Sequence, residues 1–212
     1  MIPSSGALDL LVLTADKDTA FALEGLLQRP DSLGIRSVNK QIFTHPRRDP
    51  AVLRQSQDFL RPFLNKASFA LVLLDREGCG DEGAARTVLE SQVEKLLERN
   101  GWQGRCAVVV IDPELESWFW SDSPHVDAVL GWPCQGRDLR TWLLERKFLR
   151  SGQLKPARPK EAVEAALREA RRRRSSSIYR DLAGKVGFAR CVDPAFLKLV
   201  AVLQSWFPRP TP

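Results

Sequence analysis

Continuous apolar runs constrain the fold of this 212-residue chain more than any other feature of its sequence. Residues 71–74 and 107–111 are unbroken stretches of aliphatic side chains. Such runs are typical of strands buried on both faces of a parallel sheet. Each run ends in acidic residues, Asp75 and Glu77 after the first, Glu114 and Glu116 after the second. Ligands of open α/β sheets bind at the carboxyl ends of the strands, so the sequence indicates a site there.

The remaining pattern alternates strand and helix, which predicts an α/β fold with a mostly parallel, four- to five-stranded sheet flanked by helices. Strands are expected at 8–14, 35–44, 69–74 and 106–111, with an edge strand at 126–130. Helices are expected after Asp16 and at 50–64, 84–99 and 138–148. A linker at 151–159 divides the chain into an α/β domain, 1–150, and a basic helical C-terminal extension, 151–212, with helices expected at 159–174 and from Asp193 onward.

Charge is distributed unevenly along the chain. Residues 1–135 carry 14 Lys and Arg against 19 Asp and Glu, a net charge of −5, whereas residues 136–212 carry 18 against 7, a net charge of +11. The two parts sum to the +6 of the whole chain. A basic end of this kind favours a polyanion or an acidic partner surface.

Several classes of protein are disfavoured. No apolar run approaches the roughly 18 residues of a membrane span, so no membrane association is expected. The first residues do not show the pattern of a secretory signal. The four cysteines, Cys79, Cys106, Cys134 and Cys191, match no zinc-site spacing and are interpreted as reduced thiols of a cytoplasmic protein.

The carboxylates have two interpretations. Residues two apart in extended backbone share a face, so Asp75 and Glu77 could bind one divalent cation such as Mg²⁺. They could equally form a solvated acidic turn. In a helical segment only one of Glu114 and Glu116 would face the site. The tryptophans that follow, Trp118 and Trp120, are interpreted mainly as core residues.

Four consecutive arginines, Arg171, Arg172, Arg173 and Arg174, form the densest basic run. At the end of a predicted helix they would wrap most of a turn and neutralise phosphate groups of DNA or RNA. The alternative is a solubilising helix end, at which cations complement the helix dipole.

The segments 72–78 and 113–118 resemble the motifs of Toprim-like proteins, and more closely those of a Toprim-related family in bacterial anti-phage defence operons of the methylation-associated type. The resemblance covers about residues 8–150. It implies a Mg²⁺-dependent nuclease site in which Asp75, Glu77 and Glu116 are catalytic. The same three residues would bind the metal ion, with Asp18 or Asp16 assisting, and Asp18 is the expected fourth metal ligand. It also implies other defence-system subunits as partners.

One departure stands out, because Thr14 occupies the position at which this family has a glutamate. Loss of that acid/base group costs roughly 10²–10⁴-fold in rate. Three hypotheses therefore remain open: a Toprim-type nuclease acting in phage defence, a catalytically degenerate scaffold or sensor that binds a partner protein or nucleic acid, and an α/β protein with no metal and an exposed basic helix.

Overall fold

The computed structural model describes residues 8–121, 123–133, 136–189 and 191–210. Its centre is an all-parallel sheet in the order β2-β1-β3-β4, formed by β1 (Leu8–Thr14), β2 (Lys40–Thr44), β3 (Ala67–Asp75) and β4 (Cys106–Ile111). The predicted α/β class is confirmed. Strands β1 and β4 have the predicted bounds, and β3 is longer than predicted by two residues at its start and one at its end. Strand β2 begins only at Lys40, five residues after the predicted start.

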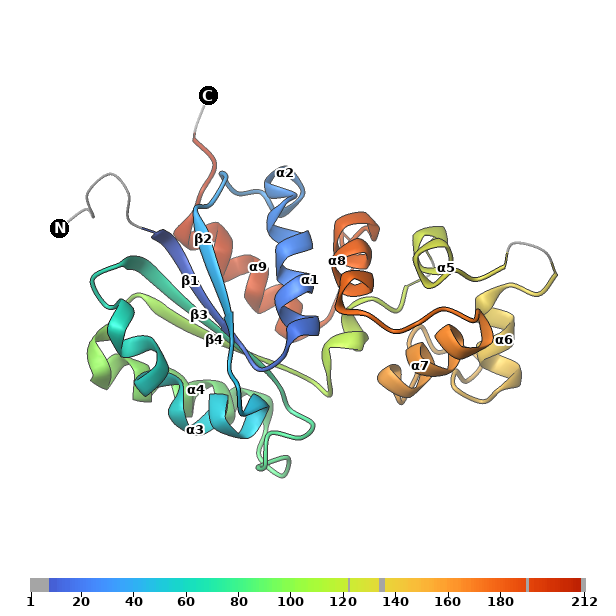
Figure 1. Cartoon of the computed structure of the whole chain (residues 1–212), viewed down its shortest axis with the longest axis horizontal. Helices are drawn as coiled ribbons and strands as arrows, with labels where there is room; N and C mark the ends of the chain where they lie inside the picture. Colours follow the sequence, from blue (N-terminus) through green and yellow to red (C-terminus); the bar gives the residue numbers. More distant parts are fainter. Residues whose placement is uncertain (1–7, 122, 134–135, 190, 211–212) are drawn as a thin grey trace.

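Alternate residues of the strands enter two separate apolar layers, as the period of a strand requires. Leu10, Val12, Leu71 and Leu73 face α1 (Lys17–Leu27) and the C-terminal helices, whereas Leu11, Leu13, Val72 and Leu74 face α3 (Arg48–Leu60) and α4 (Arg86–Leu97). Figure 1 shows these two helical layers on opposite sides of the sheet. The short elements are α2 (Pro30–Leu33), η1 (Arg61–Phe63), η2 (Glu98–Trp102) and η3 (Leu115–Trp118).

The C-terminal helices are α7 (Pro159–Glu169), α8 (Ser176–Lys185) and α9 (Pro194–Trp206). Helices α8 and α9 pack on the side of the sheet that contains α1. Helix α8 lies against α1, and α9 covers β4. Asp193 accepts hydrogen bonds from the N–H groups of Ala195 and Phe196, which confirms the predicted start of α9. The extension at 151–212 therefore shares one apolar cluster with the sheet.

The prediction of a fifth strand at 126–130 is wrong, because that segment lies in helix α5 (Pro124–Leu130). Ser123 caps its start, Pro124 occupies the first turn, and Gly131 ends it in the left-handed conformation with a φ of 71°. Val126, Val129 and Leu130 are buried at helical spacing. These capping signals outweigh the β-propensity of two valines.

Helices α5, α6 (Leu139–Glu145) and α7 form a lobe beside α8, on the right of the molecule in Figure 1. Three helices lie in the predicted places but differ at both ends, since the predicted 50–64 is Arg48–Leu60, 84–99 is Arg86–Leu97 and 138–148 is Leu139–Glu145. None of the helices in the described ranges is long and apolar enough to cross a membrane. Cys79, Cys106 and Cys191 are free thiols, and Cys134 lies outside the described residues.

The outer edge of β4 is covered by side chains rather than by another strand. Glu94 accepts a hydrogen bond from the N–H of Val108, and Glu90 accepts one from the N–H of Val110, each at 3.0 Å. Lys198 of α9 lies 3.2 Å from Glu90 and 2.8 Å from Glu94. Two carboxylates and one ammonium group thus replace a pairing strand.

Candidate functional site

Three aspartates lie where the strands end, at the edge of the sheet at which parallel strands place ligands. Asp75 is the last residue of β3. Asp16 follows β1 and caps α1 by accepting the N–H of Thr19 at 2.8 Å. Asp49 begins α3 after β2 and accepts the N–H of Asp75 at 2.8 Å. We call Asp16, Asp49 and Asp75 the crevice carboxylates.

Asp75 has the most unfavourable surroundings of the three. It is only 9% exposed, and its Oδ1 has no hydrogen-bond partner among the described residues. Burial, followed by the charges of Asp49, Asp16 and Glu116, raises the pKa of Asp75 well above its usual range, and Lys160 opposes this effect. Burial also raises the pKa of Asp49, although its bond to the Asp75 N–H acts in the other direction. An unpartnered buried carboxyl oxygen is costly, and such groups cluster at functional sites.

Thr14, at whose position the resemblance leads us to expect a glutamate, has a structural role. Its side chain is fully buried, and its hydroxyl lies 2.9 Å from the carbonyl oxygen of Asp16 and 3.2 Å from that of Phe43. The hydroxyl therefore holds the ends of β1 and β2 together and does not face outward as an acid or base.

Glu77 does not join Asp75 in the crevice. Strand β3 ends at Asp75, and Glu77 is exposed, with its N–H bonded to the carbonyl oxygen of Pro113 at 3.0 Å. The shared face that extended backbone would give the two carboxylates is lost at this turn. In the described ranges, no group of three or more carboxylate, histidine or cysteine side chains is arranged to hold a metal ion. The predicted set of Asp75, Glu77, Glu116 and Asp18 therefore does not fit a Mg²⁺ ion as it stands.

Glu116 and Asp18 are instead bound by the C-terminal part of the chain. The Arg174 guanidinium lies 2.7 Å from Asp18, 3.0 Å from Glu164 and 3.8 Å from Glu116. Ser176 donates to Asp18, and the hydroxyl of Tyr179 donates to Glu116, both at 2.6 Å. Glu116 is 2% exposed, and burial raises its pKa despite the Tyr179 hydrogen bond.

Glu114 has a basic partner of its own. Its Oε1 accepts the N–H of Lys160 at 2.9 Å, and its Oε2 lies 3.8 Å from the Lys160 ammonium group. Burial lowers the pKa of Lys160, but Glu116, Glu114 and Asp75 outweigh it and raise that pKa overall. From the helical spacing we expect only one of Glu114 and Glu116 to face the site. Both are buried, and they have different partners. Trp118 and Trp120 are core residues whose N–H groups bond to Asp193 and to Pro159.

The arginine run lies in the loop between α7 and α8, not on a helix. Helix α7 ends at Glu169, and Arg171 has a φ of 53°, which no helix accommodates. Arg172 bonds to the carbonyl oxygen of Val129 and lies over Gly131, while Arg174 binds the carboxylates described above. Arg171 and Arg173 are exposed, and their side chains make no ion pair or hydrogen bond within the described part of the chain. The predicted turn of helix is wrong, and the four arginines divide into two inward and two outward residues.

The basic character extends well beyond the arginine run. Residues 136–174 carry 13 Lys and Arg against 5 Asp and Glu, a net charge of +8. Nine of these cations are exposed: Arg137, Arg146, Lys147, Arg150, Arg158, Arg168, Arg171, Arg173 and Arg174. We call residues 136–174 the basic segment. It comprises α6, α7 and the loop that reaches the acidic crevice.

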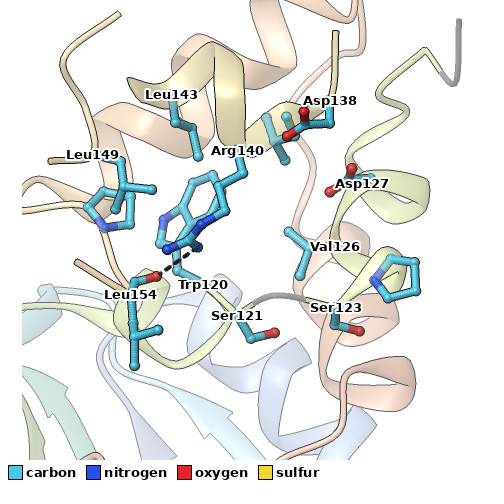
Figure 2. Close-up of a pocket in the computed structure, with 13 residues that line it drawn as sticks. Trp120, Ser121, Ser123, Val126, Asp127, Asp138, Arg140, Leu143, Leu149 and Leu154 are labelled. Atoms are coloured by element: carbon cyan, nitrogen blue, oxygen red, sulfur yellow. Dashed lines mark hydrogen bonds between the residues drawn. The ribbon is translucent and has the colours of Figure 1, made fainter. Parts of the chain in front are cut away.

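A cavity of about 330 Å³ lies inside the helical lobe, between α5, α6 and the chain at 149–156 (Figure 2). Trp120, Leu143 and Leu149 form much of its apolar wall. The guanidinium of Arg140 bonds to the carbonyl oxygens of Gln153 at 2.6 Å and Leu154 at 3.5 Å. The cavity is thus separate from the strand ends, and its one arginine is already bound to the chain's own backbone.

The chain matches no protein-family model, no curated protein and no solved structure. The chemistry of the site therefore rests on its own charges and contacts.

Proposed function

We propose that this protein is a nucleic-acid-binding subunit in which the basic segment contacts the phosphate backbone. The observation that supports this proposal best is the pair of outward arginines, Arg171 and Arg173, on a loop of a segment with a net charge of +8. Arginine binds phosphate through two parallel N–H groups, and exposed cations without internal partners retain that capacity.

The crevice favours binding over catalysis. Arg174 and Lys160 already supply positive charge to Glu116, Asp18 and Glu114. Thr14 replaces the expected acid/base glutamate, and its hydroxyl is held by backbone carbonyl oxygens. These features agree with a catalytically degenerate sheet domain that carries a basic binding surface.

Binding of fluorescently labelled DNA and RNA, followed by anisotropy across a salt series, tests the proposal. We expect the double variant Arg171→Gln/Arg173→Gln to weaken binding and to reduce the slope of log K against log salt by roughly 1.4 for single strands or 1.8 for duplex DNA, the amounts for two lost phosphate contacts. Arg99→Gln, an exposed arginine of the acidic front part, is the matched control and should leave the slope unchanged.

An unaltered slope in the double variant would contradict the proposal. Binding of an acidic polypeptide in place of both nucleic acids would identify a partner protein as the ligand instead.

We further propose, on the family resemblance, that the protein acts in the bacterial cytoplasm as one subunit of an anti-phage defence system. Phage plaque counts on cells that carry the complete operon test this role. The double variant should lose protection, whereas Arg99→Gln should retain it.

A second candidate function is a nuclease, which one observation favours: Oδ1 of Asp75 is buried and unpartnered beside Asp49 and Asp16. A Mg²⁺ ion would require these side chains to rearrange, because no three such groups of the described residues are arranged for a metal. Cleavage of labelled DNA and RNA with Mg²⁺ or Mn²⁺ tests it. Cleavage by the native chain that disappears in Asp75→Asn would establish this function. Absence of cleavage by both proteins would leave binding as the better account.

A further inference from the structure

Arg174 is the point at which the basic segment meets the acidic strand ends. Its guanidinium bridges carboxylates from three elements, Asp18 of α1, Glu164 of α7 and Glu116 of η3. The side chain is 38% exposed, so it lies at the surface of the crevice rather than inside the core. It also lies over the ring of Tyr179, 5.9 Å from the ring centroid.

The neighbours of Arg174 define the geometry of the loop. Arg172 is anchored to the end of α5, and Ser176 fixes the start of α8 to Asp18. Between these anchors, Arg173 points away from the protein while Arg174 points into the crevice. One loop therefore presents a free guanidinium to solvent beside a guanidinium that is bound to the protein itself.

From this arrangement we infer that the loop at 170–176 is a latch operated by nucleic acid: phosphate groups that bind Arg173 and Arg171 draw Arg174 away from its three carboxylates. This inference rests on the proposed nucleic-acid binding. It specifies the conformational change that binding causes at the strand ends.

The electrostatics of the loop support such an exchange. While Arg174 faces inward, it neutralises part of the charge of its three carboxylates. Phosphate groups bound at Arg173 compete with these carboxylates for Arg174, and turning Arg174 outward provides one more phosphate contact. The ion pairs of Arg174 with Asp18 and Glu164 are partly exposed and contribute little individually, and the pair with buried Glu116 is the longest of the three at 3.8 Å. Bidentate arginine–phosphate bonds are among the stronger polar contacts.

Release of Arg174 changes the crevice. Glu116 keeps the hydrogen bond from Tyr179 but loses a cation, and Asp18 keeps only Ser176 and its position in the first turn of α1. Tyr179 is the sole tyrosine of the chain and contacts both Glu116 and Arg174. Its ring is therefore a natural reporter of the latch.

The experiment uses the full chain labelled biosynthetically with 3-fluorotyrosine, which gives a single ¹⁹F resonance from Tyr179. An oligonucleotide is titrated while its binding is followed separately by anisotropy. We expect the resonance to shift in proportion to the bound fraction. We also expect Arg174→Gln to give a shifted resonance without any ligand, whereas Arg99→Gln should keep the native position.

A second variant keeps Arg174 and removes the charges of two of the carboxylates that bind it. Asp18→Asn/Glu164→Gln should shift the resonance in the free protein and tighten oligonucleotide binding about 3- to 10-fold, because more of the protein is then in the competent state. Glu161→Gln/Glu169→Gln, two exposed carboxylates of the same segment, controls for the general loss of negative charge and should tighten binding less.

The outcomes separate the two proposals. Saturating oligonucleotide with an unmoved resonance would overturn the latch and leave the binding function intact. Absence of binding by anisotropy would overturn both. The same shift with inorganic phosphate alone would overturn the assignment of the latch to a polymer.

Discussion

Asp75 combines two properties that rarely occur together in a residue that serves only stability. It is almost fully buried, and one of its oxygens has no partner among the described residues. A charge in such a position reduces stability, and proteins retain this kind of cost mainly where a group has a function. The structure therefore predicts that stability and function conflict at this residue.

Asp75→Asn is expected to raise the free energy of unfolding by about 1–2 kcal/mol near neutral pH, because the neutral amide avoids the cost of burying a charge. The pKa of Asp75 is raised in the folded state, so the native protein holds the proton more tightly than the unfolded chain does. The stability of the native protein consequently falls as the pH rises from 3.8, the ordinary pKa of an aspartate, toward the raised pKa of Asp75.

The measurement is urea denaturation at a series of pH values for both proteins. The difference between them should widen as the pH rises through that window. Asp81→Asn, an exposed aspartate, is the control and should show no such widening. A constant difference across the series would contradict the assignment of the effect to the Asp75 charge.

The sequence revealed part of this site. Asp75 and Glu116 could be found because each follows an apolar run that predicts a strand. Asp49 and Lys160 could not, because each lies at a helix start far from those runs, and only the packing of α3 and α7 in the folded chain brings them near Asp75. The one local signal for Asp49 is its position in the first turn of a helix that follows a strand.

Among the elements, the contact between α1 and α8 depends on one glycine. A Cβ built on Gly25 would lie 2.4 Å from the carbonyl oxygen of Arg180 and 3.0 Å from the Cβ of Ala183. The backbones of the two helices therefore approach each other more closely than any side chain at position 25 permits. Arg29 strengthens the same contact by donating to the carbonyl oxygens of Ala183 and Val186 at the end of α8.

Gly25→Ala should destabilise the protein by roughly 1–3 kcal/mol, the usual cost of overpacking. The sign of the change in the free energy of unfolding is informative, because alanine in a helix interior ordinarily stabilises a protein by about 1 kcal/mol relative to glycine. Gly184→Ala is the matched control, since a Cβ there meets no atom within 4 Å, and it should not destabilise. The melting temperatures of both variants provide the measurement. Equal changes in melting temperature would contradict the close approach of α1 and α8.

Element prediction succeeded where hydrophobic pattern alone determines structure. The four strands, α1, α4 and α9 follow from apolar periodicity and from caps such as Asp193. It failed at 126–130 and at the arginine run. In the first case helix caps outweighed β-propensity, and in the second the contacts of Arg172 and Arg174 with distant residues hold the chain in a loop.

At the scale of the molecule, a single apolar cluster joins the sheet to the C-terminal helices. It contains Leu10 and Leu71 from the sheet and Tyr179, Leu199 and Phe207 from the last third of the chain. A chain that ends at residue 150 would keep α1 on this face of the sheet but would lose α9, which covers β4, and α8, which packs on α1.

We therefore expect a fragment of residues 1–150 to lack a cooperative thermal transition and to bind a hydrophobic dye, in contrast to the full chain. Near-ultraviolet circular dichroism and calorimetry provide the measurement. A cooperative transition with native-like aromatic signals would instead establish residues 1–150 as an independent folding unit, as the linker at 151–159 suggests.

The covered edge of β4 has a consequence for the order in which the chain is made. Lys198, a cation that lies beside both Glu90 and Glu94, belongs to α9 and is synthesised 108 and 104 residues after them. Until then Glu94 lacks this counter-charge and, among the described residues, Glu90 has only Arg86 of its own helix as a cationic partner, so the two carboxylates are held less firmly at the strand edge. A strand edge with unpaired N–H and C=O groups is a template for pairing with another chain. Premature termination before α9 would therefore yield a product that is prone to aggregate, not merely one that is less stable.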